Sequence, residues 1–107
     1  MTTDQSRHPL ERVHAFEWDE KKRISNLAKH GIDFEDATEV FYGEVLVSRS
    51  DRNNEERWVG WGELEGRIIA VVYTWRKNAL RLISARRANK DEARQYHRQK
   101  SRRPPKG

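Results

Sequence analysis

Two arginines at the end of a predicted strand are the strongest chemical signal in the sequence. Arg86 and Arg87 follow directly on the segment Leu80–Ala85. A guanidinium binds two phosphate oxygens at once and keeps its charge, so it can stabilise the extra negative charge of a phosphate under attack. One reaction that would use such a cation is metal-independent phosphodiester cleavage, which also needs a base for the attacking hydroxyl and an acid for the leaving oxygen. We predict Arg86 as the catalytic cation. The alternative is that one of the two arginines pairs with a core carboxylate such as Glu56 and braces the fold.

Strand alternation predicts that Arg86 and Arg87 point to opposite faces of a sheet. One face would carry Leu82, Ser84 and Arg86, and the other Arg81, Ile83, Ala85 and Arg87. Only one of the two arginines is then expected to reach any single phosphate. The remaining basic candidates for binding RNA are Arg87, Arg76, Arg81 and Lys90.

Three further side chains complete the predicted catalytic set. Glu56 and Arg57 precede the segment Trp58–Trp61, so Arg57 is a candidate second phosphate clamp and Glu56 a base or a partner of an arginine. An exposed ion pair of little energetic value is the alternative for both. Tyr96 can stack on a base or transfer a proton if cations lower its pKa, or it can simply pack on the sheet.

Other catalytic chemistries find no support in the sequence. The chain has no cysteine, and its four histidines lack metal-ligand spacing. There is no Gly-rich phosphate loop and no G-x-S-x-G motif. We therefore expect no metal and no cofactor.

Composition restricts the class of protein and places the basic charge. The 107 residues carry 22 Lys and Arg against 17 Asp and Glu, for a formal net charge of +5. Nine of the basic residues and only two of the acids lie from Arg86 onward, so the excess sits at the C-terminal end and favours a polyanionic partner. The longest apolar run, Ile68–Tyr73, is far too short for a membrane span. We expect one cytoplasmic domain with no membrane association.

Capping signals and apolar spacing predict two N-terminal helices. Asp19 is a candidate N-cap of a helix that ends at Gly31, with a buried stripe expected along one face. A second helix begins at Asp33 and ends near Gly43. The buried stripes comprise Ile24, Leu27 and Ala28 in the first helix, and Phe34, Ala37, Val40 and Phe41 in the second.

A strand meander and a last helix follow. Period-two or apolar segments predict strands at Val45–Val47, Trp58–Trp61, Ile68–Trp75 and Leu80–Ala85, preceded by a short one at Phe16–Trp18. Asn89 and Glu92 resemble a capping box that opens a helix through about Lys100. The order predicts an α+β fold: two N-terminal helices, an antiparallel meander and a C-terminal helix. Residues 1–15 are expected to be a flexible lead, 16–99 the domain and 100–107 a basic disordered tail.

Several ordered motifs closely resemble the BrnT family, the toxins of type II toxin–antitoxin pairs. They extend from Phe16 to His97 and comprise Phe16-Glu17-Trp18-Asp19, Lys29-His30-Gly31, Phe34-Glu35-Asp36-Ala37, Val40-Phe41, Glu56-Arg57, Val71-Val72-Tyr73-Thr74, Ile83-Ser84-Ala85-Arg86-Arg87-Ala88 and Tyr96. The resemblance implies a RelE-like fold and a ribonuclease that cleaves RNA and halts growth. It also implies a BrnA-type antitoxin with a ribbon-helix-helix domain, through which the complex would bind its own promoter DNA.

The chain departs from the family pattern at two places. Glu20 stands where many members have a proline, which is harmless in the first turn of a helix. Asn53 and Asn54 occupy a loop in which many members carry His and Gly, so a catalytic histidine is not expected there. The competing hypothesis is a non-enzymatic module similar to double-stranded RNA binders, which would bind RNA and leave it intact.

Overall fold

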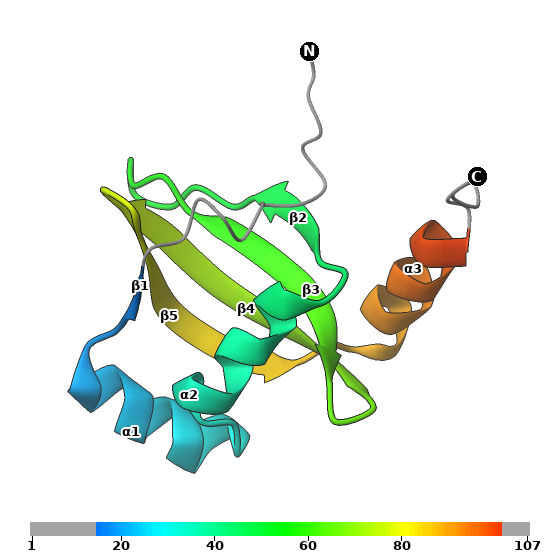
Figure 1. Ribbon diagram of the computed structural model, residues 1–107, viewed down its shortest axis with the longest axis horizontal. Helices are drawn as coiled ribbons and strands as arrows, with labels where there is room; N and C mark the ends of the chain where they lie inside the picture. The colour runs from blue at the N-terminus through cyan, green and yellow to red at the C-terminus, as the bar shows by residue number, and fades with distance from the viewer. Residues whose placement is uncertain (1–14, 102–107) are drawn as a thin grey trace.

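A five-stranded sheet positions the candidate residues. The computed structural model describes residues 15–101, and its strands lie in the order β1-β5-β4-β3-β2 (Figure 1). The strands are β1 (Ala15–Glu17), β2 (Leu46–Arg49), β3 (Trp58–Leu64), β4 (Arg67–Arg76) and β5 (Ala79–Arg87). The helices are α1 (Glu20–His30), α2 (Phe34–Ala37), the 3₁₀ helix η2 (Thr38–Tyr42) and α3 (Lys90–Ser101).

The α+β class and the meander are confirmed, with one difference in strand direction. Strands β2 to β5 pair antiparallel in sequence order, and β4 is central as its long apolar run predicts. Strand β1, however, pairs parallel with the start of β5. A parallel neighbour needs a long connection, and residues 18–78 separate β1 from β5. The sheet is therefore mixed rather than purely antiparallel.

Helix α1 has the predicted ends, but the residues predicted to be buried are exposed. Asp19 accepts a hydrogen bond from the Lys21 backbone N–H at 2.8 Å, and Gly31 ends the helix at φ 73°. The predicted buried stripe is wrong, because Ile24 is 56% exposed, Leu27 41% exposed, and Ala28 is also exposed. The buried residue of α1 is the polar Asn26.

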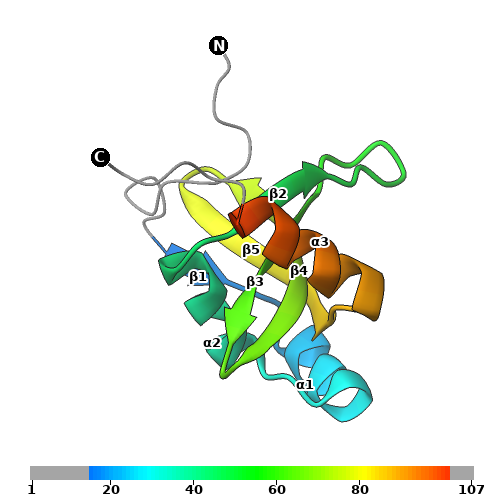
Figure 2. The same ribbon diagram turned by 90° about the vertical axis from the view of Figure 1, so that its right-hand side faces the viewer.

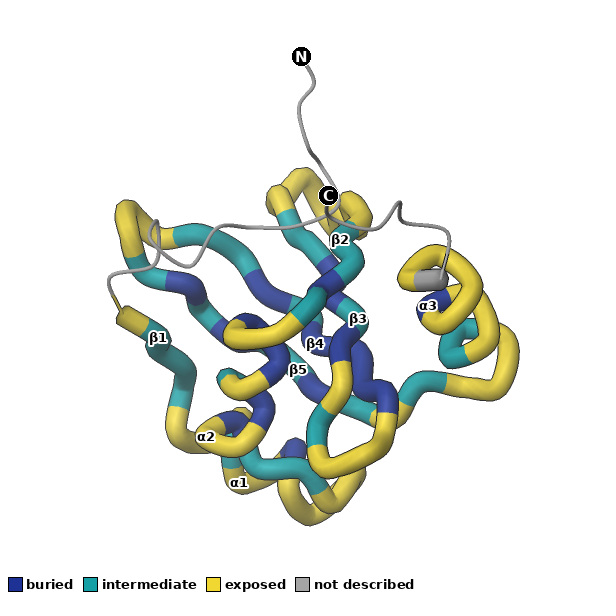
Figure 3. Tube along the Cα trace, turned by 45° about the vertical axis from the view of Figure 1, so that its right-hand side comes forward, coloured by how far each residue is buried: buried dark blue, intermediate teal, exposed yellow. Residues whose placement is uncertain are grey.

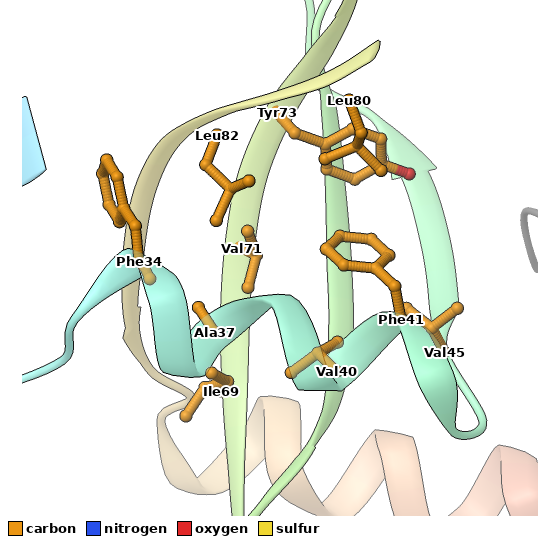
Figure 4. Close-up of a cluster of buried hydrophobic side chains, with 11 residues drawn as sticks. Phe34, Ala37, Val40, Phe41, Val45, Ile69, Val71, Tyr73, Leu80 and Leu82 are labelled. Atoms are coloured by element: carbon orange, nitrogen blue, oxygen red, sulfur yellow. The ribbon is translucent and has the colours of Figure 1, made fainter. Parts of the chain in front are cut away.

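Helix α2 and the continuing helix η2 supply the predicted apolar face. All four residues of that face are buried against the sheet: Phe34, Ala37, Val40 and Phe41. Figure 4 shows these side chains directed at Val71, Tyr73 and Leu82 of the sheet. Where β3 passes beneath η2 it carries glycine, and a Cβ at Gly62 would lie 2.5 Å from a Val40 methyl carbon. The core thus occupies one face of the sheet.

Helix α3 begins as predicted and stands apart from the α1–α2 layer. Figures 1 and 2 show it leaving the end of β5 and lying next to β3 and β2. It is exposed along most of its length, apart from the buried Tyr96 (Figure 3).

The predicted terminal segments fall largely outside the described residues. Residues 1–14 and 102–107 are not described, so the predicted lead and tail stay predictions. Ala15 belongs to β1, and α3 extends through Ser101. Within residues 15–101, no helix has the length and apolar character needed to cross a membrane.

Candidate functional site

Arg86 lies near the end of β5 on the sheet face opposite the core. It is paired with Ala70 of β4, whereas its neighbours Ala85 and Arg87 are paired with Val71 and Ile69 of the core-facing set. The side chain of Arg86 is 41% exposed. The guanidinium is therefore held at the surface of the sheet and remains accessible to a ligand.

Glu92, in the first turn of α3, orients this guanidinium. Its two carboxylate oxygens accept hydrogen bonds from Arg86 Nη1 at 2.8 Å and Nη2 at 2.9 Å. The same carboxylate accepts the Asn89 backbone N–H at 2.9 Å, and Asn89 Oδ1 accepts the Glu92 backbone N–H at 2.8 Å. This is the predicted capping box. One carboxylate thus caps the helix and fixes Arg86.

Both members of this pair stay charged at physiological pH. Hydrogen bonds from Arg86 are the main cause that lowers the pKa of Glu92 to about 2, with smaller contributions from the Asn89 backbone and Trp61. The hydrogen bond to Glu92 in turn raises the pKa of Arg86. Because a carboxylate with so low a pKa is a weak base, Glu92 serves to position the arginine rather than to take a proton.

The guanidinium keeps donors for a phosphate. Two of its five N–H groups bind Glu92, and a further Nη1 hydrogen bond reaches the Arg87 carbonyl at 3.1 Å. Two N–H groups therefore remain, which is the number that a bidentate phosphate contact uses. The predicted alternative is a pairing of one arginine with a carboxylate such as Glu56. Arg86 does pair with a carboxylate, but the partner is Glu92, whereas Glu56 lies 3.5 Å from Arg49.

A β-bulge changes the faces predicted for β5. The register between β4 and β5 shifts at Val72/Tyr73, which leaves one extra residue in β5 between Leu82 and Ser84. Leu82 consequently lies in the core with Ala85, not on the Arg86 face as strict alternation predicted. Beyond the bulge the alternation holds, so Arg87 points away from Arg86, toward the core side, and is exposed.

Tyr96 is used in attaching α3 to the rest of the protein. Its ring is 2% exposed, and its hydroxyl donates a hydrogen bond to the Glu44 carbonyl at 2.8 Å. This is the packing alternative for Tyr96. The hydroxyl reaches the loop before β2 rather than the guanidinium of Arg86.

Arg57 and Glu56 belong to a second charged cluster, at the start of β3. Arg57 binds Glu55 through Nε and Nη2 at 3.0 and 2.7 Å, and the exposed Glu56 lies 3.5 Å from Arg49. Trp61 of β3 is paired with Ala70, which is also the partner of Arg86, so Trp61 and, by alternation, Arg57 lie on the sheet face of Arg86. Arg57 lies four residues from Trp61 along β3, which is two strands away from β5. The Cα atoms of Arg57 and Arg86 are therefore roughly 17 Å apart. Because each guanidinium is held by a different carboxylate, Glu55 for Arg57 and Glu92 for Arg86, the two arginines do not form one cluster.

Arg76 and Arg81 form a third cluster, at the other end of β5. Both lie near Glu17 of β1, with N–O distances of 4.0 Å for Arg76 and 3.0 Å for Arg81. Lys90 is exposed at the start of α3, close in sequence to Arg86. The structure thus divides seven of the eight predicted residues among three charged clusters, places Tyr96 at the contact between α3 and the loop before β2, and brings none of the other predicted catalytic residues to Arg86.

Sequence reasoning missed the role of Glu92 and a cavity beside it. The cavity, of about 270 Å³, lies between α3 and strands β2 and β3 and is lined by Leu46, Val47, Ser48, Trp61, Glu92, Gln95 and Gln99. Its aromatic and amide side chains are of the kind that hold an unstacked base. The capping-box spacing identifies Glu92 as a helix cap, but it carries no signal for the contact with Arg86. Among residues 15–101, no group of three or more His, Asp and Glu side chains is arranged to hold a metal ion.

Comparisons with known proteins agree with the motif resemblance. The family described as the ribonuclease toxin BrnT of type II toxin–antitoxin systems has a model that matches residues 18–92. Among solved structures, the chain is similar to the ribonuclease toxin BrnT of Brucella abortus. The two are 37% identical with a TM-score of 0.56, over 71% of this chain and 97% of that chain. No curated protein sequence gives a significant match. The matched segment includes Arg57, Arg86 and Glu92, and Tyr96 lies beyond it.

Proposed function

Since this chain belongs to the BrnT family of ribonuclease toxins of type II toxin–antitoxin systems, we propose that it cleaves RNA without a metal ion and thereby inhibits translation and growth. The observation that carries the proposal is the guanidinium of Arg86, clamped by Glu92 and still 41% exposed. A fixed arginine supplies the positive charge that a metal ion supplies in other nucleases.

The proposed chemistry is transesterification at the phosphate that Arg86 binds. The 2′-hydroxyl loses its proton to water, its oxygen attacks phosphorus, and the bond to the 5′-oxygen breaks, so that a 2′,3′-cyclic phosphate forms and the 5′-oxygen takes up a proton from water. The pentacoordinate phosphate between these states carries the most negative charge. The two remaining N–H groups of Arg86 donate to its non-bridging oxygens. Because Glu92 fixes the guanidinium beforehand, little reorganisation is needed in the transition state.

We assign the other predicted residues by their distance from Arg86. Arg57 binds a phosphate further along the RNA strand. Glu56, which lies 3.5 Å from Arg49, helps to hold the basic side chains at that second phosphate. Arg87, Lys90, Arg76 and Arg81 contribute longer-range attraction for RNA. Tyr96 acts indirectly, because it anchors the helix that carries Glu92.

We also propose that the antitoxin is of the BrnA type and neutralises the chain in the cytoplasm. The family description names a type II system, which supports a protein antitoxin. We expect it to cover Arg86 and the cavity beneath α3, and its ribbon-helix-helix domain to bring the complex to the promoter DNA. Loss of RNA cleavage when purified antitoxin is added in equal amount tests the neutralisation.

RNA cleavage in EDTA tests the main proposal. Wild-type protein should cut a labelled RNA in EDTA, and Arg86→Ala should lower the rate by on the order of 10²- to 10³-fold, as expected for a lost transition-state donor. Arg94→Ala is the matched control, because Arg94, like Arg86, pairs with an acid of the first turn of α3. Its partner is Asp91 at 3.1 Å, and its side chain is 63% exposed. A wild-type protein that binds RNA tightly and leaves it intact would refute the enzyme and favour the binding-module alternative.

A further inference from the structure

A second cavity opens between α1 and the edge of β5. It has a volume of about 270 Å³ and is lined in part by Lys21, Lys22, Ser25, Lys29, His30 and Ser84. We call it the lysine cavity. None of the eight residues that line it is acidic, whereas three are lysines.

Asn26 builds this cavity by joining α1 to β5. Strand β1 pairs only with residues 79–81, so the backbone of β5 is uncovered further along. The Asn26 amide satisfies that edge: Nδ2 donates to the Ala85 carbonyl at 2.9 Å, and Oδ1 accepts the Ala85 N–H at 3.1 Å. A third hydrogen bond, at 3.0 Å, ties the same amide to the Ile32 carbonyl. The lysines are therefore mounted on a helix that is fixed to the strand of Arg86.

Two acids close in sequence to these lysines are paired with an arginine rather than with a lysine. Arg23 pairs with Glu20 through Nη2 and with Asp33 through Nη1 at 3.0 Å. Within residues 15–101, the side chains of Lys21, Lys22 and Lys29 make no ion pair. Their three charges are consequently available to a ligand.

The cavity adjoins Arg86 along the strand. Ser84 lines the cavity and lies two residues before Arg86, with the same side of β5 presented to both. The separation of the two Cα atoms along the strand is roughly 7 Å. An anion held at Ser84 by the lysines therefore lies next to an anion held at Arg86.

We propose that the lysine cavity binds the phosphodiester backbone of the RNA strand immediately beside the scissile phosphate, an assignment that rests on the proposed function. Three ammonium groups spread over one wall match repeated negative charges rather than a single one, and the hydroxyls of Ser25 and Ser84 add donors to phosphate oxygens. The contact is to the backbone, so it contributes affinity and register without base preference.

Binding of an RNA that cannot be cut tests the assignment separately from catalysis. The probe is a fluorescent oligoribonucleotide with 2′-O-methyl groups, titrated with protein by anisotropy at several KCl concentrations. The variant Lys21→Gln/Lys22→Gln/Lys29→Gln should weaken binding and reduce the slope of log affinity against log salt by up to about 2, since each phosphate contact to a single strand contributes about 0.7. The control Arg67→Gln/Lys77→Gln/Arg98→Gln removes equal charge from exposed positions elsewhere.

The outcomes separate the two proposals. Equal affinities and salt slopes for the two triple variants, with circular dichroism showing both folded, would overturn the lysine cavity even if wild-type protein cleaves RNA. A wild-type protein that binds the probe through these lysines but cuts no RNA would refute the proposed function and, with it, the placement beside a scissile phosphate, and only the binding of the RNA backbone by the lysines would stand. Inorganic phosphate at millimolar concentration should compete only weakly. Full competition by it would overturn the assignment to a polyanionic strand.

Discussion

Replacing Glu92 by Gln isolates the ion pair that holds Arg86. Glutamine at this position keeps the capping-box hydrogen bond to Asn89 and nearly the same shape, but it loses the charge. The pKa of Glu92 lies at about 2 against an ordinary value of 4.5, which corresponds to roughly 3 kcal/mol. Solvent screens part of this, because the Arg86 side chain is 41% exposed. We therefore expect Glu92→Gln to lower the free energy of unfolding by about 1–2 kcal/mol, or the melting temperature by roughly 5–10 °C.

The pH dependence of this loss gives the sharper measurement. Because the pKa of Glu92 is lower in the folded than in the unfolded state, the ion pair contributes fully above pH 4.5, and its contribution disappears as the pH falls toward about 2. The variant has no group that titrates at this position. The difference in unfolding free energy between wild-type and variant protein should thus be constant above pH 4.5 and shrink in acid.

Urea unfolding followed by tryptophan fluorescence at a series of pH values measures this difference. Asp91→Asn is the control, because Asp91 is the neighbouring acid of the same helical turn and its side chain is 89% exposed in its pair with Arg94. We expect that control to be close to wild type at every pH. If Glu92→Gln matches the control at neutral pH, or if its deficit is the same in acid, the ion pair does not hold Arg86 as we argue.

Three further substitutions test how the site is supported. Tyr96→Phe removes the hydrogen bond to the Glu44 carbonyl, which should cost about 1 kcal/mol of stability and leave most RNA cleavage intact, since the ring stays in place; calorimetry and a cleavage assay check this. Asn26→Ala leaves buried backbone groups of β5 without partners and should lower the free energy of unfolding by about 2–3 kcal/mol in urea titrations. Gly62→Ala places a methyl group 2.5 Å from a Val40 carbon and should lower the free energy of unfolding by about 1–3 kcal/mol. The double variant with Val40→Ala should recover part of this stability, because the clashing methyl groups of Val40 are removed.

Much of the fold could be predicted because local signals and tertiary packing agree. The Asp19 and Gly31 caps fixed the bounds of α1, and the apolar spacing from Phe34 to Phe41 identified the helical face that covers the sheet. The long apolar run of β4 indicated a central strand. Each of these rests on a pattern of neighbouring residues, which a single sequence contains.

The failures occurred where a distant segment decides the outcome. The spacing of Ile24 and Leu27 predicts a buried stripe on α1, but the helix is rotated so that Asn26 can cover the edge of β5, a partner 59 positions away in the chain. The β-bulge between Leu82 and Ser84 likewise leaves no local signal, and it reverses which residues of β5 face the core. Neither the edge nor the bulge can be read from periodicity.

The candidate site shows the same division between local and distant causes. Arg86 could be predicted from its type and its place at a strand end, and the capping box at Asn89 and Glu92 from its spacing. Their connection could not be predicted, because it depends on the direction in which α3 leaves the strand. Tyr96 fixes that direction by holding the helix against the loop before β2. The geometry of the guanidinium therefore depends on how firmly α3 is attached, and a contact that displaces this helix would change RNA cleavage without touching the RNA.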